Sequence, residues 1–128
     1  MPIVQEPWNS RFEEYYTLNL EVPDISTQNS AGYVGVPIDG YVVKAYSVIA
    51  GAITGADADI TLSDGTTDMT NGVITVANSG SAAGDVDSCT PTANNEVTAG
   101  DVIKAISDGA STNAVLVRIT LVIKKQRP

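Results

Sequence analysis

Apolar and polar residues alternate along several short segments of the chain, and a period of two is typical of a β-strand with one buried face. The longest such segment is 114–123, in which every second residue is aliphatic: Val115, Val117, Ile119, Leu121 and Ile123. The segment 17–22 alternates in the same way. Since no helical pattern is long enough to cross between parallel strands, the sequence predicts an all-β protein with antiparallel strands.

Four dipeptides that tolerate the positive φ angles of tight hairpin turns punctuate these segments: Asp39-Gly40, Asp64-Gly65, Asn71-Gly72 and Asp108-Gly109. The strands expected around them are 17–22, 33–38, 41–49, 59–62, 73–76, 102–107 and 114–123. Pro37 indicates an edge strand or a strand end, and residues 79–87 are expected to form a loop. The spacing predicts a single domain over residues 17–128, an antiparallel β-sandwich or jelly roll of seven or eight strands.

All seven aromatic residues lie within the first 46 positions. Residues 1–16 show no sustained period and contain two prolines, so they are predicted to form an extended N-terminal arm. Large amphipathic rings are common anchors of binding surfaces. The candidate anchors of the arm are Trp8, Phe12, Tyr15 and Tyr16. Two uses of the arm stay open, which are packing against its own body and docking on another chain.

The chain contains no histidine, which excludes Ser-His-Asp and Cys-His catalysis and histidine metal ligands. Paired carboxylates could hydrolyse glycosides without histidine, but Glu96 is the only glutamate beyond Glu21 and nothing marks a buried acid. The single cysteine, Cys89, cannot form an internal disulfide and has no basic neighbour, so a small buried filler is expected there. We expect a protein that is not an enzyme and needs no cofactor.

Fifteen acidic and seven basic residues give a net charge of −8, which argues against binding nucleic acid through its phosphates. A nucleic-acid mimic would need dense rows of carboxylates, whereas these acids are scattered at turns. The densest cluster is Asp57, Asp59, Asp64 and Asp68. Its spacing does not match a calcium-binding EF-hand loop, so turn formation is the expected role and no metal site is predicted.

No apolar run approaches the ~20 residues that span a bilayer, so no membrane partner is expected. The first residues lack the basic and apolar regions of a signal peptide, and synthesis without export is therefore expected. At the other end, three basic residues form a short tail: Lys124, Lys125 and Arg127. The tail is either a solvated terminus or a salt-sensitive contact with a neighbouring acidic surface.

Beyond position 46 the core must be built from small and aliphatic side chains alone. Such a body is thin, and burying further apolar surface between subunits would stabilise it. Leu116 and Val122 fall on the mixed face of the last predicted strand, beside Arg118, where a subunit contact would cover them. We therefore expect a cyclic homo-oligomer, and specifically a homotrimer.

Four segments of the chain, 53–61, 73–88, 97–103 and 115–124, resemble small head proteins of tailed bacteriophages, the capsid decoration or cement proteins. The resemblance implies a jelly-roll-like body, usually trimeric, on the outer capsid surface of the virion at local three-fold positions. It implies the major capsid protein as partner and a role in holding neighbouring capsomers together. The alternative is a receptor- or glycan-binding domain of a phage tail or fibre, and a bacterial β module without viral connection stays open.

Overall fold

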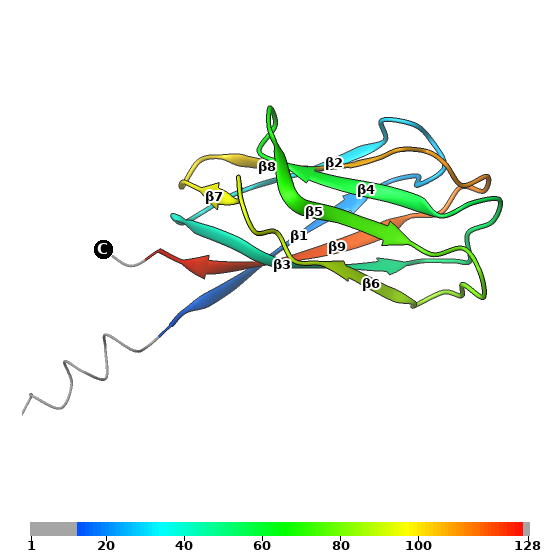
Figure 1. The fold of residues 1–128 in the computed structure, drawn as a ribbon, viewed down its shortest axis with the longest axis horizontal. Coiled ribbons are helices and arrows are strands. Elements are labelled where there is room, and N and C mark those ends of the chain that lie inside the picture. The colour runs from blue at the N-terminus through cyan, green and yellow to red at the C-terminus, as the bar shows by residue number, and fades with distance from the viewer. Residues whose placement is uncertain (1–12, 127–128) are drawn as a thin grey trace, which may run out of the picture.

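The structure is a computed structural model, and it describes residues 13–126. These residues fold into two antiparallel sheets that face each other, so the predicted all-β sandwich is confirmed (Figure 1). The described strands are β1 (Tyr15–Val22), β2 (Ala31–Gly35), β3 (Gly40–Ile49), β4 (Ala58–Ser63), β5 (Asp68–Val76), β6 (Val86–Cys89), β7 (Glu96–Val97), β8 (Val102–Ser107) and β9 (Val117–Lys125).

One sheet has five strands in the order β1-β9-β3-β6, with β7 also paired to β3. The other has four strands in the order β2-β8-β4-β5. The first and last strands of the chain are therefore neighbours, and β9 lies between β1 and β3 over its whole length. Both ends of the described chain leave the sandwich at the same end (Figure 1).

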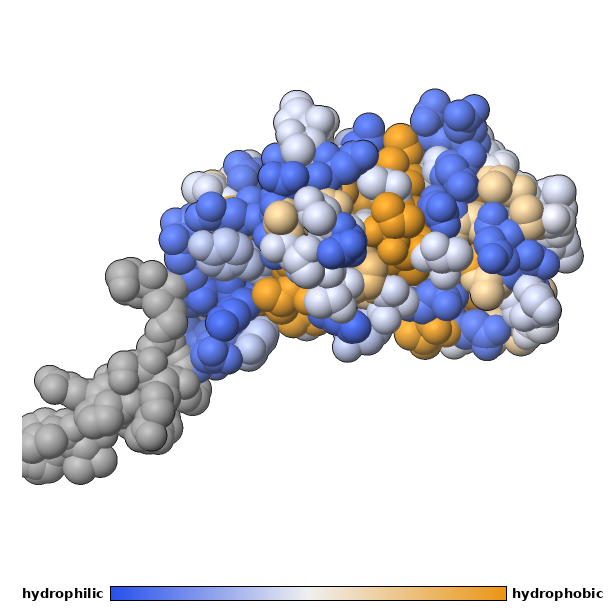
Figure 2. All heavy atoms as spheres, viewed as in Figure 1, coloured by the Kyte–Doolittle hydropathy of each residue, from blue (hydrophilic) through white to orange (hydrophobic). Residues whose placement is uncertain are grey.

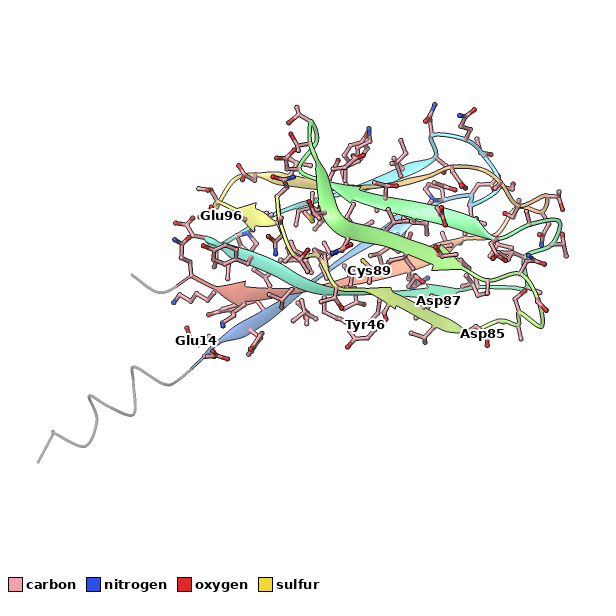
Figure 3. The ribbon with its side chains drawn as sticks, viewed as in Figure 1. Glu14, Tyr46, Asp85, Asp87, Cys89 and Glu96 are labelled. Carbon is pink, nitrogen blue, oxygen red and sulfur yellow. The ribbon has the colours of Figure 1, made fainter. Side chains whose placement is uncertain are left out.

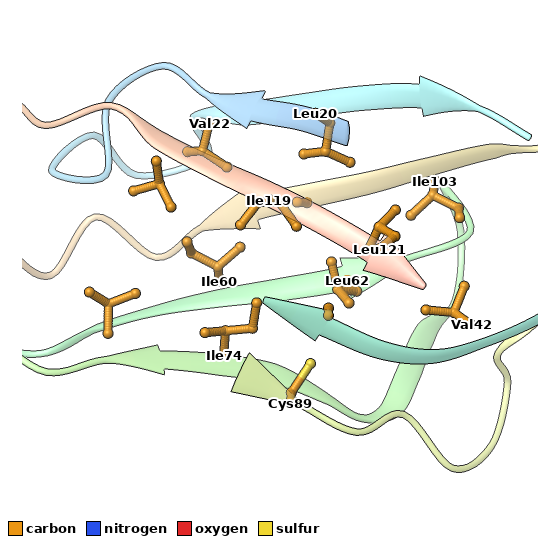
Figure 4. Close-up of a cluster of buried hydrophobic side chains, with 14 of the residues drawn as sticks. Leu20, Val22, Val42, Ile60, Leu62, Ile74, Cys89, Ile103, Ile119 and Leu121 are labelled. Atoms are coloured by element: carbon orange, nitrogen blue, oxygen red, sulfur yellow. The ribbon is translucent and has the colours of Figure 1, made fainter. Parts of the chain in front are cut away.

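The alternation in β9 is confirmed, because Val117, Ile119, Leu121 and Ile123 are buried between the sheets. Val115, just before the strand, is buried as well. Facing them from the four-stranded sheet are Ile60, Leu62, Ile74 and Ile103, so the centre of the core is aliphatic (Figure 4). Branched side chains are common in β-strands largely because they pack closely against their neighbours on a sheet.

The strand β2 ends at Gly35, before Pro37, and forms an edge of the four-stranded sheet. Gly32 in β2 approaches β1 so closely that a Cβ atom there would collide with the carbonyl oxygen of Glu21. The two edge strands therefore close one side of the sandwich at this point. Pro37 predicted a strand end or an edge, and the structure has both.

The hairpin predicted at Asn71-Gly72 is wrong. The strand β5 runs from Asp68 through this dipeptide, and the reversal between β4 and β5 lies at residues 64–67 instead. Asn71 does adopt a positive φ of 59°, but it produces a register break within β5 rather than a turn. Gly72 is needed there because a Cβ atom would collide with Met69.

The described residues contain nine strands rather than seven or eight, and the additions are short. β6 starts inside the loop predicted for residues 79–87, and β7 has two residues. β1 begins at Tyr15, two residues earlier than expected, so Tyr15 and Tyr16 belong to the body. No helix long and apolar enough to span a membrane occurs between residues 13 and 126.

Candidate interaction surfaces

Every aromatic side chain in residues 13–126 lies outside the core. These are Tyr15, Tyr16, Tyr33, Tyr41 and Tyr46, and each is exposed by more than a third. The buried positions of the core hold aliphatic side chains together with Met69 and Cys89, and no aromatic ring. Exposed tyrosines on a sandwich with such a core are candidates for contacts with another molecule.

Three of the tyrosines share the outer face of the five-stranded sheet. The register places Tyr15 of β1 and Tyr41 of β3 on either side of Lys124 of β9. Tyr46 lies further along β3, opposite Thr120 and Ser88, on the side that faces away from the other sheet (Figure 3). We call this outer surface the tyrosine face.

Exposed aliphatic side chains continue the tyrosine face. Val48 of β3 pairs with Val86 of β6 and with Arg118 of β9, and both valines are exposed. A shallow groove next to them is lined by Asn19, Leu20, Glu21, Val48, Arg118 and Thr120. Hydrophobic side chains also reach the surface in separate patches over the middle of the body, between more hydrophilic ends (Figure 2).

Basic side chains of this face are held by neighbours within the chain. Arg118 lies 3.5 Å from the Glu21 carboxylate, and the Lys44 ammonium lies 5.7 Å from the Tyr46 ring centre. On the opposite sheet, Lys104 lies 5.9 Å from the ring centre of Tyr33. Cation–π contacts of this kind hold exposed rings in position.

The predicted basic tail is part of the fold as far as it is described. Lys124 and Lys125 end β9, and their ammonium groups lie 3.0 Å and 3.2 Å from the carboxylates of Glu13 and Glu14. These two lysines therefore form ion pairs with the residues just before β1 of the same chain. The three other predicted contact residues, Trp8, Phe12 and Arg127, lie outside the described residues.

The acidic residues act mainly at turns, as the sequence predicted. The Asp64 carboxylate accepts hydrogen bonds from the backbone amides of Thr66 and Thr67, at 2.9 Å and 2.7 Å, and from the Thr66 hydroxyl. These bonds lower the pKa of Asp64. Asp57 likewise holds the backbone amide of Asn78. Within residues 13–126, no three carboxylate or thiol side chains are grouped as a metal site.

Cys89 closes one edge of the core, where β6 pairs with β3. Its burial raises the pKa of the thiol to about 11. A thiol of this kind stays protonated at neutral pH and is a poor nucleophile. The structure thus agrees with the expected role of Cys89 as a small buried filler.

Comparisons with known proteins give a fold but no family. No family model and no curated protein matches the sequence. Among solved structures, the chain is similar to CsCBM6-3 from Clostridium stercorarium in complex with cellobiose, with a TM-score of 0.52 and 12% identity over 92% of this chain and 90% of that one. It is also similar to chains of two phage capsids.

The first is from the capsid asymmetric unit of cyanophage Pam1, with a TM-score of 0.53 and 11% identity over 89% of this chain and 86% of that chain. The second is from the acid-stable capsid of Helicobacter pylori bacteriophage KHP30, with a TM-score of 0.53 and 15% identity over 88% of this chain and 93% of that chain. At these identities the likeness establishes the sandwich fold alone.

Proposed function

We propose that this chain is a structural virion protein, a decoration protein that binds the outer surface of a phage head and stabilises contacts between capsomers. The observation that carries the proposal is the match to chains of two phage capsid structures over most of their length. Its proposed partner is the major capsid protein.

The extent of those matches supports a decoration role over a place in the shell itself. Because 86% and 93% of the phage chains are covered by this short chain, each of them is close to it in length. The likeness is therefore to whole small subunits of a capsid rather than to one domain of a larger subunit.

The tyrosine face supports the same function. Decoration requires modest contacts repeated by symmetry, which together give avidity without a catalytic centre. Tyr15, Tyr41 and Tyr46 are exposed and supply contact area at low cost in rotamer entropy. We propose that this face and the N-terminal arm both contact the capsid.

We further propose that the protein works as a homotrimer. Leu116 and Val122 support a trimer less strongly than the sequence analysis expected, because both side chains are already partly buried within one copy. The exposed Val73 and Val102, on the outer face of the four-stranded sheet and away from the tyrosine face, are a better reason, since subunit contacts would bury them. Equilibrium sedimentation at micromolar concentration is expected to give three times the mass of one chain, and a single-chain mass would refute the trimer.

We also propose that the protein has no enzymatic activity. The chain lacks histidine, and its only thiol is buried and protonated. Asp24 and Asp64 are only partly buried, and their lowered pKa values are the reverse of what a general acid needs.

Gold labelling of virions tests the proposed function. Antibodies against this chain should decorate intact heads of the phage that encodes it, with little label on tails. Label confined to tails would favour the alternative function, and particles without label on either part would exclude both.

The alternative is a receptor- or glycan-binding domain of a phage tail or fibre. It is favoured by the similarity to a module bound to cellobiose and by the groove beside Tyr46, which combines Asn19, Arg118 and Thr120 with apolar surface. Calorimetric titration with cellobiose would detect such a site. The decoration function predicts no heat of binding there.

A further inference from the structure

The edge strands of the two sheets differ in how they are protected against pairing with other chains. An exposed edge offers unpaired backbone N–H and C=O groups to other chains, and proteins usually shorten, break or bend such strands. Within the described residues, β6 and β7 are short, β2 holds two glycines and ends before Pro37, and β5 is interrupted at Asn71. Each of these edges is therefore a poor template for pairing.

The edge strand β1 has none of these protections. It runs for eight residues without glycine, proline or lysine, and its register with β9 is unbroken. No strand of residues 13–126 pairs with its other side. At Glu21 that side is covered by Gly32, whereas residues 15–17 and Asn19 are exposed.

The hydrogen-bond pattern shows which backbone groups point outward there. The Lys125 amide donates to the Glu14 carbonyl at 2.9 Å, so these two residues form a hydrogen-bonded pair of the antiparallel ladder. Every second residue from Glu14 onward, including Tyr16 and Leu18, bonds to β9 in the same way. The backbone groups of Tyr15, Thr17 and Asn19 consequently point to the open side.

We infer that this open edge accepts an extended segment of the capsid subunit as an additional antiparallel or parallel strand. The inference rests on the proposed function. An extended backbone offers donors and acceptors at the same spacing as these unpaired groups, which is recognition by strand addition. The added strand would lie beside Tyr16 and Leu18 on its inner face and beside Thr17 and Asn19 on its outer face.

The side chains along the edge define what kind of segment fits. Tyr16 is exposed although it points inward, while Leu18 of β1 and Val34 of β2 are half-buried and pack against the core. A strand added here would cover these apolar groups. The matching segment thus alternates between apolar residues toward the core and polar residues toward solvent.

A second copy of the chain fits this edge less well. Since β9 occupies the other side of β1, two copies that keep the same sheet face outward could join their β1 strands only antiparallel. Pairing centred on Thr17 would set Glu13 opposite Glu21 of the second copy, and like charges directly opposite are destabilising. The other edges of a second copy are the short and interrupted ones described above.

Substitution at Thr17 tests the inference. Thr17→Pro removes an N–H that points to the open side and breaks no bond to β9, so the fold should survive. Thr17→Ala removes the same side chain but keeps the N–H. The assay is co-sedimentation with heads of the phage that encodes the chain, assembled without it, and hydrogen exchange of the bound wild-type protein gives a second readout.

We expect Thr17→Ala to bind like the wild type and Thr17→Pro to bind at least about tenfold more weakly. On binding, exchange of the amides at Thr17 and Asn19 should slow, while Tyr16 and Leu18 are protected already. The edge inference is wrong if Thr17→Pro binds heads as tightly as the wild type and exchange of the Thr17 amide does not change on binding. The proposed function stands in that case, because the wild type still binds. Failure of the wild type to bind heads overturns both, and loss of self-association in Thr17→Pro would assign the edge to a second copy instead.

Discussion

Glu14 and Lys125 are joined twice, through the backbone at 2.9 Å and through their charged side chains at 3.2 Å. The pair ties the residues just before β1 to the last residues of β9. It also sets the alternation of hydrogen bonds along β1, from which the open edge at Tyr15, Thr17 and Asn19 is inferred. One contact thus connects the two ends of the described residues and orients the proposed strand-addition site.

The contact between β2 and β1 at Gly32 is predicted to be essential for stability. Gly32→Ala places a methyl group against the Glu21 carbonyl oxygen, a backbone atom that cannot move away. We expect the free energy of unfolding, measured with denaturant, to fall by about 1–3 kcal/mol. Gly35→Ala, in the same strand with open space around the new Cβ, is the control and should change stability by less than about 0.5 kcal/mol. Equal effects of the two substitutions would mean that the strands do not approach as described.

Turn carboxylates should make the protein acid-sensitive. Hydrogen bonds from Ser26 and from the Thr66 and Thr67 amides lower the pKa values of Asp24 and Asp64 below 3.8. The unfolded chain therefore binds protons more readily below about pH 4, so the stabilisation is present above that pH and is lost as the pH falls through the folded pKa values. In acid unfolding followed by circular dichroism, the double variant Asp24→Asn and Asp64→Asn should lose stability less steeply than the wild type below about pH 4. An unchanged slope would contradict this role.

Cys89 should be inaccessible to thiol reagents in the folded protein. With a thiol pKa of about 11, only about one molecule in a thousand carries a thiolate at pH 8, and the side chain is buried besides. We expect Ellman's reagent to react slowly with the native protein and at once after denaturation. Stoichiometric labelling of the native protein within minutes would show that the core opens at β6.

Removal of residues 1–12 should separate binding from folding. The cut leaves β1 and the pairs formed by Glu13 and Glu14 in place, so thermal unfolding should be unchanged within a few degrees. If Trp8 and Phe12 anchor the protein, binding of the truncated chain to phage heads should weaken strongly. A Trp8→Ala and Phe12→Ala double variant of the full chain should show the same loss, and undiminished binding of both would exclude the arm from the interface.

Much of the fold could be predicted because the alternation of apolar and polar residues along a strand indicates which side chains are buried. The inward residues of β9 and the identity of β8 follow from local sequence alone. The hairpin prediction at Asn71-Gly72 was wrong because a positive φ angle occurs both in tight turns and at register breaks within strands. β6 and β7 could not be predicted, because strands this short are too brief to show an alternating pattern. Their pairing with β3 also depends on residues that are distant in the sequence.

The candidate surfaces were less accessible to sequence reasoning. The rings of Tyr15 and Tyr16 could be proposed as anchors, but their place in β1 depends on pairing with Lys124 and Ile123, more than a hundred residues away. For the same reason, nothing local indicated that Tyr41 and Tyr46 would join Tyr15 on one face. The open edge of β1 is a property of sheet order, which short-range patterns do not encode.

A cryo-electron microscopy reconstruction of the native phage head tests the proposed decoration function most directly. The account predicts density for this sandwich on the outer surface of the capsid, repeated by symmetry, with β1 and the tyrosine face turned toward capsid subunits. A head reconstruction without this density, with the sandwich found instead in the tail or in no part of the particle, would contradict it.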